Sequence, residues 1–223
     1  ILLLGVGIAI AYDTFFVEEV IKDSRTVCIK DGADLRNLNS IQKACESIDG
    51  VFHLASLCLG HCQKKPREGL DINIMGTYNL LEACLIKGVK RIMFASSSSV
   101  YGDAVYSPMD EIHPFKNKNF YGATKIAGEA IIHAFYHAHG LEHLNFRFMN
   151  VYGPKQDYIG VYVAVIVNII DRVIKGLPPI IYGNGNQSYD FVYVDDACIH
   201  TYIARKEIDN QGYYRDVIIG VMR

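Results

Sequence analysis

Apolar and polar residues follow one another in blocks that predict alternating strands and helices. Apolar-rich runs at 1–5, 51–55, 91–95 and 144–149 are typical of buried parallel strands, and 25–30 is a plausible further strand. Strands that alternate with helices require right-handed crossover connections, which make the strands parallel. We therefore expect the α/β class, with a doubly wound parallel sheet.

Helical patterns fill several of the intervals between these strands. Helices are expected at 14–21, from Asn39 onward, at 71–87, at 121–139 and at 165–174. The sequence from Asn39 includes a capping residue for its short helix. Gly88 and Gly140 follow two of the longer helices, and glycine readily adopts the conformation that ends a helix.

The composition argues against several classes of function. The 223 residues carry a formal net charge of -2, which shows no bias toward nucleic acid or an anionic membrane. No apolar run approaches the roughly 18 residues needed to span a bilayer. The six cysteines are scattered, mostly within apolar runs, which favours reduced thiols over a disulfide framework. We expect a cytoplasmic protein without a bound metal that binds neither nucleic acid nor membrane.

Candidate chemistry gathers after the run at 91–95. The serines from Ser96 to Ser99 close that strand, and open α/β sheets bind ligands at the carboxyl ends of their strands. Tyr121 and Lys125 stand four residues apart, so both side chains leave one face of the predicted helix. An ammonium near a phenol lowers the pKa of the phenol, which can then act as a general base. Such a pair also arises by chance on helix surfaces, so the spacing alone leaves a structural role open.

Four segments together resemble a known family. They are Ser97–Gly102, the pair Tyr121 and Lys125, Arg147–Pro154 and Asp190–Asp195. In this order and spacing they resemble the extended short-chain dehydrogenase/reductase superfamily, in its NAD-dependent nucleotide-sugar epimerase/dehydratase branch. The resemblance implies a Rossmann-type NAD-binding domain over 1–155, with an atypical or incomplete N-terminal part. It also implies a partial nucleotide-sugar-binding region over 156–223, interleaved with the last Rossmann elements.

The same resemblance implies NAD as the cofactor. The residues at the family's cofactor-binding positions are Gly5, Gly7, Asp34, Leu35, Leu54, Ala55, Ser56, Asn73, Tyr121, Lys125 and Phe148. Only Gly5 and Gly7 match the family's three-glycine loop. Asp34 matches an aspartate beside the adenine ring, with an ordinary loop aspartate as the alternative. Asn73 matches a structural asparagine that orients the strand ends, with an exposed helix asparagine as the alternative.

By resemblance, three residues carry the catalysis. Tyr121 is expected to take the proton from a sugar hydroxyl, and Ser97 to donate a hydrogen bond to the same hydroxyl. Lys125 is expected to lower the pKa of Tyr121 and to bind the nicotinamide ribose. The expected substrate-binding residues are Ser97, Ser98, Tyr121, Asn150 and Tyr189. Tyr189 stands where many relatives place an arginine against the nucleotide phosphates, and a phenol supplies no positive charge there.

Ser98 and Ser99 separate the branches of the family. Related dehydratases carry Asp-Glu at these positions because elimination of water needs a second acid/base pair, and UDP-glucuronate decarboxylases keep the glutamate. With two serines, oxidation, rotation of the ketose and re-reduction remain. We expect NAD-dependent epimerisation of a nucleotide sugar, at C4 of a UDP-hexose through a transient 4-keto intermediate, as in UDP-glucose 4-epimerases.

Alternative functions stay open. A dehydratase, decarboxylase or sugar oxidoreductase of the same family would share the main site residues. A non-catalytic nucleotide-binding protein would account for the missing third glycine. The resemblance further implies a homodimer through the helices at 73–87 and 120–139, with Ile131, Phe135 and Tyr136 as apolar contacts.

Overall fold

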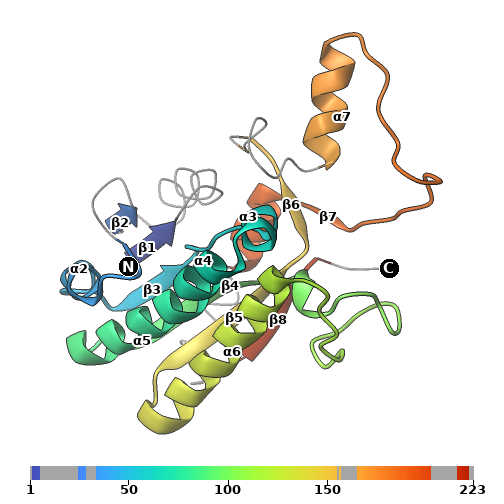
Figure 1. Cartoon of the computed structure of the whole chain (residues 1–223). Helices are drawn as coiled ribbons and strands as arrows, with labels where there is room; N and C mark the ends of the chain where they lie inside the picture. The colour runs from blue at the N-terminus through green and yellow to red at the C-terminus, as the bar shows by residue number, and fades with distance from the viewer. Residues whose placement is uncertain are drawn as a thin grey trace.

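The computed structural model describes residues 2–5, 25–28, 34–154, 156, 165–201 and 215–220 (Figure 1). The elements in chain order are β1 (Leu2–Gly5), β2 (Arg25–Cys28), α2 (Leu38–Ala44), β3 (Gly50–His53), α3 (Leu59–Lys64), α4 (Pro66–Leu70), α5 (Gly76–Lys87), β4 (Arg91–Ser97), α6 (Phe120–His139), β5 (Glu142–Phe148), β6 (Asn150–Tyr152), α7 (Val165–Ile174), β7 (Phe191–Tyr193) and β8 (Arg215–Ile219). A π-helical turn at Asp71–Met75 joins α4 to α5, and a 3₁₀ turn at Ser98–Val100 follows β4.

Six of the described strands form one sheet. Their order is β2-β1-β3-β4-β5-β8, and every neighbouring pair is parallel. The chain moves outward from β1 to β2 and then returns to the other side of β1 with β3, so the sheet is doubly wound. The predicted α/β class with a doubly wound parallel sheet is confirmed.

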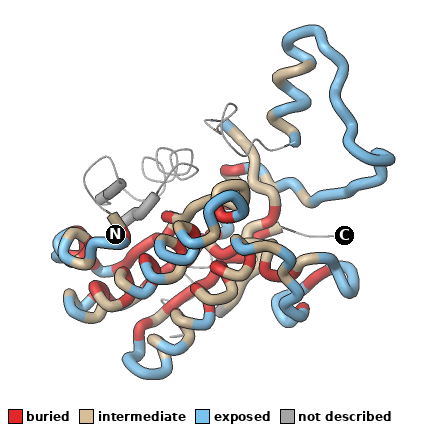
Figure 2. Tube along the Cα trace, in the orientation of Figure 1, coloured by how far each residue is buried: buried red, intermediate tan, exposed pale blue. Residues whose placement is uncertain are grey.

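Hydrophobic cores cover both faces of the central strands. Neighbouring residues of a strand point to opposite faces, so Ile92 and Met93 of β4 enter different cores. The first core includes Ile41 of α2, Leu80 of α5, Ile92 and Ile132 of α6. The second includes Phe52, Met93, Leu144, Phe146 and Ala197. Figure 2 shows buried segments along the central strands, while the outer sides of α5 and α6 are more exposed.

Several predicted boundaries were wrong by a few residues. β4 extends two residues beyond Ala95, so the first two serines of the run belong to the strand. Asn37 caps α2 instead of Asn39, because the Asn37 side chain accepts a hydrogen bond from the Ser40 N–H at 3.2 Å. The helix expected from residue 71 continues an earlier one that begins at Pro66. The helix expected at 14–21 lies outside the described residues.

The predicted helix ends at Gly88 and Gly140 are confirmed. Both residues have φ of 72°, the left-handed conformation that glycine adopts without strain. These turns direct the chain into β4 and β5, which are neighbours in the sheet.

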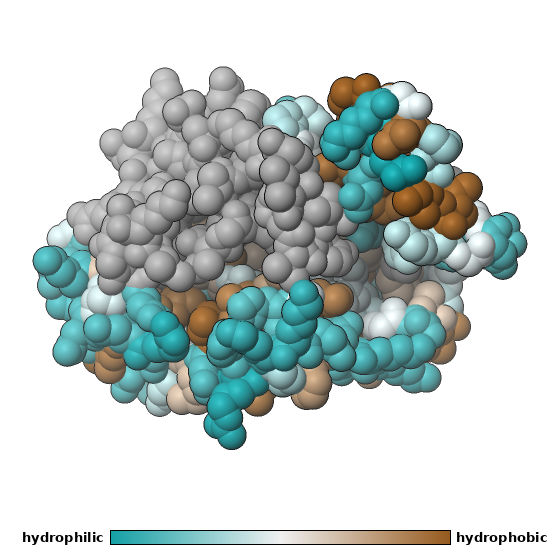
Figure 3. All heavy atoms as spheres, turned by 45° about the horizontal axis from the view of Figure 1, so that its top comes forward, coloured by the Kyte–Doolittle hydropathy of each residue, from teal (hydrophilic) through white to brown (hydrophobic). Residues whose placement is uncertain are grey.

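Strand β6 begins the part of the chain that leaves the main sheet. It pairs in parallel with β7, while β8 returns to the main sheet beside β5. The predicted helix at 165–174 is confirmed as α7, and it and the segment after it carry exposed apolar residues: Ile169, Ile170, Val173, Ile174, Ile180 and Ile181. Figure 3 shows apolar surface gathered in this region. Within the described residues, no helix is long and apolar enough to cross a membrane.

The contact between α6 and β4 leaves no room for a side chain at Gly128. A Cβ atom there would lie 2.7 Å from Cζ of the Phe94 ring. We expect Gly128→Ala to lower the free energy of unfolding by about 1–3 kcal/mol, because overpacking displaces the ring or the helix. Urea denaturation measures this change. Ala130→Ser, on the exposed side of the same helix, is the control and should change stability by less than about 0.5 kcal/mol. Equal losses in the two variants would contradict the close contact.

Candidate active site

Three segments meet at the carboxyl ends of β3 and β4. Residues 54–56 follow β3, Ser97 closes β4, and Tyr121 lies in the first turn of α6. The Ser97 and Ser56 side chains lie close enough to the Tyr121 hydroxyl to favour its ionised form. The fold therefore brings three predicted site residues together from distant parts of the sequence, at the edge where α/β sheets bind ligands.

The position of Tyr121 follows from the residues around the start of α6. Asn119 Oδ1 accepts a hydrogen bond from the Gly122 N–H at 2.7 Å and so caps the helix. A Cβ atom at Gly122 would collide with the carbonyl oxygen of Ser99. Glycine at this position therefore lets α6 approach the 3₁₀ turn after β4, which carries Tyr121 to the strand end.

Lys125 lies one helical turn beyond Tyr121 and is only 2% exposed. Its Nζ donates a hydrogen bond to the carbonyl oxygen of Ala95 at 2.6 Å. The same nitrogen lies 4.9 Å from the centroid of the Phe94 ring and 5.4 Å from that of Tyr121, within the range of cation–π attraction. Burial lowers the pKa of Lys125 to about 7, because the ammonium loses its hydration.

The expected lowering of the Tyr121 pKa is wrong for the protein without ligands. Burial raises the pKa of Tyr121 to about 12, because the phenolate would lose its hydration. Hydrogen bonds with Ser97 and Ser56 act in the opposite direction but do not offset burial. The ammonium of Lys125 is directed to the carbonyl oxygen of Ala95. Proton abstraction by Tyr121 near neutral pH therefore needs more stabilisation of the phenolate than the ligand-free site supplies.

The serines after β4 form a short hydrogen-bonded chain. Ser97 Oγ accepts a hydrogen bond from the Ser99 N–H at 3.2 Å and donates one to Ser99 Oγ at 3.2 Å. Ser98 lies half-buried in the 3₁₀ turn between them. These bonds fix the turn that holds the Ser97 hydroxyl beside Tyr121.

Asn73 joins the loop after β3 to helix α6. Its Oδ1 accepts a hydrogen bond from the Leu57 N–H at 2.7 Å, and its Nδ2 lies 3.1 Å from the Leu57 carbonyl oxygen. The same Nδ2 donates to Thr124 Oγ1 at 3.1 Å, beside Lys125 in the sequence. Asn73 is 3% exposed, so the alternative of an exposed helix asparagine is wrong. Its amide connects two of the segments that form the site.

The predicted cofactor residues near the N-terminus have different surroundings in the structure. Gly5 is the last residue of β1, and Gly7 lies outside the described residues. Asp34 forms an ion pair with Arg36, whose Nη2 lies 2.6 Å from Asp34 Oδ2, and hydrogen bonds from Arg36 lower the pKa of Asp34. Leu35 packs in the first hydrophobic core.

Three further predicted residues lie around the point where the chain leaves the main sheet. Phe148 ends β5, half-buried, with its ring centroid 5.9 Å from that of Phe146. Asn150 begins β6, and its Nδ2 donates to the carbonyl oxygen of Asp190 at 3.1 Å. Tyr189 is 56% exposed. The Asn150 amide thus also joins β6 to the start of β7.

The sequence analysis missed a buried histidine beside the site. His53 in β3 is fully buried, and its Nε2 lies 2.8 Å from Thr77 Oγ1. Burial, and then the charge of Lys125, lower the pKa of His53 to about 3, so the imidazole is neutral at neutral pH. A single histidine within an apolar run carries no signal that distinguishes it from a structural residue.

An ion cluster of the buried Glu129 and Arg147 with the half-buried Asp216 was also not predicted from the sequence. Arg147 Nη2 lies 2.7 Å from Glu129 Oε2 and 2.6 Å from Asp216 Oδ2. One signal was present in the sequence, since Glu129 follows Lys125 by four residues on a predicted helix and so shares its face.

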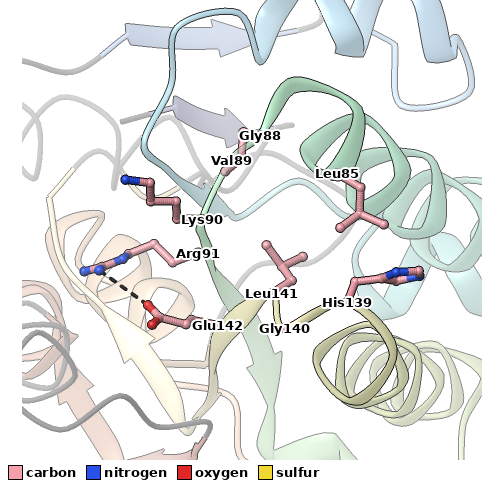
Figure 4. Close-up of a pocket in the computed structure, with 9 residues that line it drawn as sticks. All are labelled: Leu85, Gly88, Val89, Lys90, Arg91, His139, Gly140, Leu141 and Glu142. Atoms are coloured by element: carbon pink, nitrogen blue, oxygen red, sulfur yellow. Dashed lines mark ion pairs between the residues drawn. The ribbon is translucent and has the colours of Figure 1, made fainter.

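A cavity of about 420 Å³ lies at the opposite end of the sheet (Figure 4). It is formed by the ends of α5 and α6 and the starts of β4 and β5, and Arg91 pairs with Glu142 at its edge across 3.4 Å. None of its lining residues is a predicted site residue. Since ligands of α/β sheets bind at the carboxyl ends of the strands, the Tyr121 site is the stronger candidate.

Comparisons with known proteins match this geometry. The family described as "NAD dependent epimerase/dehydratase family" matches residues 12–220. A putative UDP-glucose 4-epimerase from Methanocaldococcus jannaschii is 33% identical over 219 residues, which cover 88% of this chain and 72% of that protein. The chain spans about half the length of several other curated relatives, among them a UDP-N-acetyl-α-D-glucosaminuronate decarboxylase.

Solved structures resemble the chain along most of its length. A UDP-N-acetylglucosamine 4-epimerase from Methanobrevibacter ruminantium, in complex with UDP-N-acetylmuramic acid, has a TM-score of 0.86 at 26% identity, covering 99% of this chain and 77% of that one. A UDP-glucose 4-epimerase from Thermus thermophilus, in complex with NAD, has a TM-score of 0.81 at 26% identity, covering 98% and 77%.

The buried amide of Asn73 generates a stability prediction. We expect Asn73→Ala to lower the free energy of unfolding by about 2–4 kcal/mol, because the N–H and carbonyl of Leu57 both lose a partner. Chemical denaturation measures the loss. Asn79→Ala is the matched control, since the Asn79 side chain donates to the Leu35 carbonyl at 2.8 Å and is only half-buried. Its expected cost is about 0.5–1.5 kcal/mol. A loss no larger for Asn73→Ala than for Asn79→Ala would refute the assigned role.

Proposed function

Because the chain belongs to the NAD-dependent epimerase/dehydratase family, we propose that it uses NAD to epimerise a nucleotide sugar. The proposed reaction takes place at C4 of a UDP-hexose through a transient 4-keto intermediate. The observation that carries the proposal is the meeting of Ser97, Tyr121 and Lys125 at the carboxyl ends of β3 and β4. Relatives described as UDP-glucose and UDP-N-acetylglucosamine 4-epimerases support the substrate class.

In the proposed mechanism Tyr121 moves the proton. Its phenolate oxygen takes the proton of the C4 hydroxyl as hydride leaves the same carbon, and returns a proton to the ketone oxygen when hydride comes back. Ser97 lies beside Tyr121, and its single O–H, directed to Ser99 Oγ in the structure, turns to donate to the same substrate oxygen and shares its developing charge. Lys125 stabilises the phenolate from the adjacent turn of α6.

The residues at the strand ends fit the family's cofactor. When bound, NAD supplies the hydride acceptor and donor that the exchange requires. Lys125 has three N–H donors, and among the described residues Ala95 is its one hydrogen-bond acceptor, so its ammonium can also donate to ribose hydroxyls. Residues 54–56, directly after β3, would line the same position, and Ser56 offers a hydroxyl there.

The 3₁₀ turn after β4 favours epimerisation over elimination. Elimination of water needs a second acid/base pair beside the substrate, and this turn carries the hydroxyls of Ser98 and Ser99 instead of carboxylates. Hydroxyl groups do not change protonation near neutral pH, so they cannot fill that role.

A decarboxylase is the second candidate within the family. A relative described as a UDP-sugar decarboxylase supports it. The two reactions are separated by incubation with UDP-glucuronate: an epimerase gives UDP-galacturonate, whereas a decarboxylase releases carbon dioxide. Bound NAD without turnover of any UDP-sugar tested would point to another nucleotide sugar or to a dehydrogenase, whereas a protein that binds no NAD would favour the non-catalytic alternative.

We also propose that the protein is a cytoplasmic homodimer. Five cysteines in the described part of the chain have free thiols, as expected in a reducing compartment. They are Cys45, Cys58, Cys62, Cys84 and Cys198. The segment at 73–87 exposes the apolar residues Met75, Tyr78 and Ile86. In the helix at 120–139, Ile131 and Phe135 pack partly into the first core, so Met75, Tyr78 and Ile86 supply the exposed apolar face of the proposed interface.

The assignment of Tyr121 as the base is tested by Tyr121→Phe. We expect kcat for the interconversion of UDP-glucose and UDP-galactose to fall by about 10²- to 10⁴-fold, because the proton acceptor is removed. Proton NMR of the anomeric signals in the presence of NAD measures the rate. Tyr136→Phe, in the same helix, is the control and should keep the parent rate. A Tyr121→Phe variant with parental activity would exclude Tyr121 as the base.

The dimer is tested by placing a charge on its proposed face. The parent protein is expected to show twice the 25.0 kDa chain mass in light scattering. We expect Ile86→Asp to shift the mass toward that of one chain, because a carboxylate is costly to bury in an apolar interface. Ile112→Asp, at a loop residue 86% exposed, is the control and should leave the mass unchanged. A monomeric parent protein would contradict the proposal.

A further inference from the structure

Helix α6 carries a second ionised side chain into the core beyond Lys125. Glu129 follows Lys125 by four residues, on the same face of the helix, and is 3% exposed. Its carboxylate accepts a hydrogen bond from Ser96 Oγ in β4. Arg147 in β5 donates to both carboxylate oxygens, from Nε to Oε1 at 3.1 Å and from Nη2 to Oε2 at 2.7 Å. The carboxylate is therefore held in place from two strands.

The cluster around Arg147 has one negative charge in excess. Arg147 Nη2 also lies 2.6 Å from Asp216 Oδ2 in β8, so two carboxylates share one guanidinium. The remaining contacts of Arg147 are neutral: Nη1 donates to the Tyr101 hydroxyl at 3.0 Å and to the Glu111 carbonyl at 2.7 Å. Asp216 is partly exposed, at 22% of its side chain, and also lies 3.5 Å from His133 Nε2. Glu129 is the fully enclosed carboxylate of the two, and Lys125 lies one helical turn before it.

The other groups that face Lys125 bring no negative charge at neutral pH. The imidazole of His53 in β3 is neutral, since its pKa is lowered to about 3. Burial raises the pKa of the Cys62 thiol in α3, which therefore stays protonated. The pKa of Tyr121 is raised to about 12. Burial is the main effect that lowers the pKa of Lys125, and it is opposed by Cys62 and then by the charge of Glu129. Because the Cys62 thiol is protonated at neutral pH, Glu129 is the carboxylate among these neighbours that opposes the effect of burial.

We propose that Glu129 is a positioning residue of the active site, whose fixed carboxylate keeps Lys125 protonated and thereby available to stabilise the Tyr121 phenolate. The hydrogen bonds of the Glu129 carboxylate within the described residues come from Ser96 and Arg147. It acts through Lys125 and through Ser96, the neighbour of Ser97. The kinetic consequence rests on the proposed function, whereas the effect on the charge of Lys125 does not.

Glu129→Gln tests the proposal because it keeps the size of the side chain and an acceptor for Ser96 while removing the charge. The titration of Lys125 is followed by NMR of the lysine Cε signals in ¹³C-lysine-labelled protein, with Lys125→Met for assignment. Removal of an anion disfavours the protonated lysine, so we expect the titration midpoint of Lys125 to move to lower pH by about 1 unit. An unchanged midpoint would overturn the proposal.

Asp216→Asn is the matched control, because it removes a carboxylate that contacts the same Arg147 Nη2 but belongs to β8, not to the face of α6 that carries Lys125. We expect the Lys125 midpoint to stay within about 0.3 units of the parent value, and an equal shift in both variants would contradict a specific role for Glu129. His133 Nε2 lies 3.5 Å from Asp216 Oδ1, so Asp216→Asn also removes a partner of His133. To exclude this side effect, the Lys125 midpoints are compared between proteins that all carry His133→Gln.

Kinetics in the parent, Glu129→Gln and Glu129→Asp proteins give the second measurement. If Lys125 must be protonated, the alkaline limb of the pH profile of kcat/KM moves to lower pH by the same amount in Glu129→Gln, with KM nearly unchanged. Glu129→Asp keeps the charge, so its alkaline limb should lie close to that of the parent protein. It also serves if Glu129→Gln does not fold, since a Lys125 midpoint in Glu129→Asp more than about 1 unit below the parent value would then refute the proposal. A parent protein without epimerase activity would remove the proposed function but leave the titration test intact.

Discussion

The burial of one lysine between α6 and β4 is the constraint on which the candidate site depends. An ammonium removed from water is stable only where other groups replace its hydration. Here the carbonyl of Ala95, the face of Phe94 and the charge of Glu129 do so. Ala95 and Phe94 of β4 can reach Lys125 only if the helix lies close to the strand, and Gly128 permits that approach. The packing of the helix on the sheet therefore also determines the charge state of the site.

The same constraint explains why buried polar side chains lie in this region. Asn73 fixes the loop after β3 to Thr124, and the serines after β4 fix the turn against which α6 begins. Each bond satisfies a polar group that would otherwise be buried without a partner. As a result, Tyr121 and Lys125 stand on one helix, while the strand ends that face them are held by side chains of neighbouring elements.

Much of this arrangement follows from local sequence. Apolar strands between helical segments predict the parallel sheet, glycine predicts the ends of α5 and α6, and the spacing of Tyr121 and Lys125 places them on one face. Contacts across long separations were not predictable in the same way: Arg147 lies 18 residues from Glu129 and 69 from Asp216. The raised pKa of Tyr121 was missed for a related reason. It depends on how fully the fold surrounds the phenol, and spacing along a helix does not report that burial.

The two buried charges on α6 also connect stability with chemistry. Arg147 needs an anion to be stable in the core, and Glu129 supplies it at the cost of an excess negative charge beside Asp216. In the mechanism and the inference proposed above, a protonated Lys125 opposes that charge and favours the ionised form of Tyr121. Charge balance in the core and base strength at the site then make the same demand on Lys125. On this proposal, a substitution deep in the cluster changes the proton affinity of the site without touching a ligand.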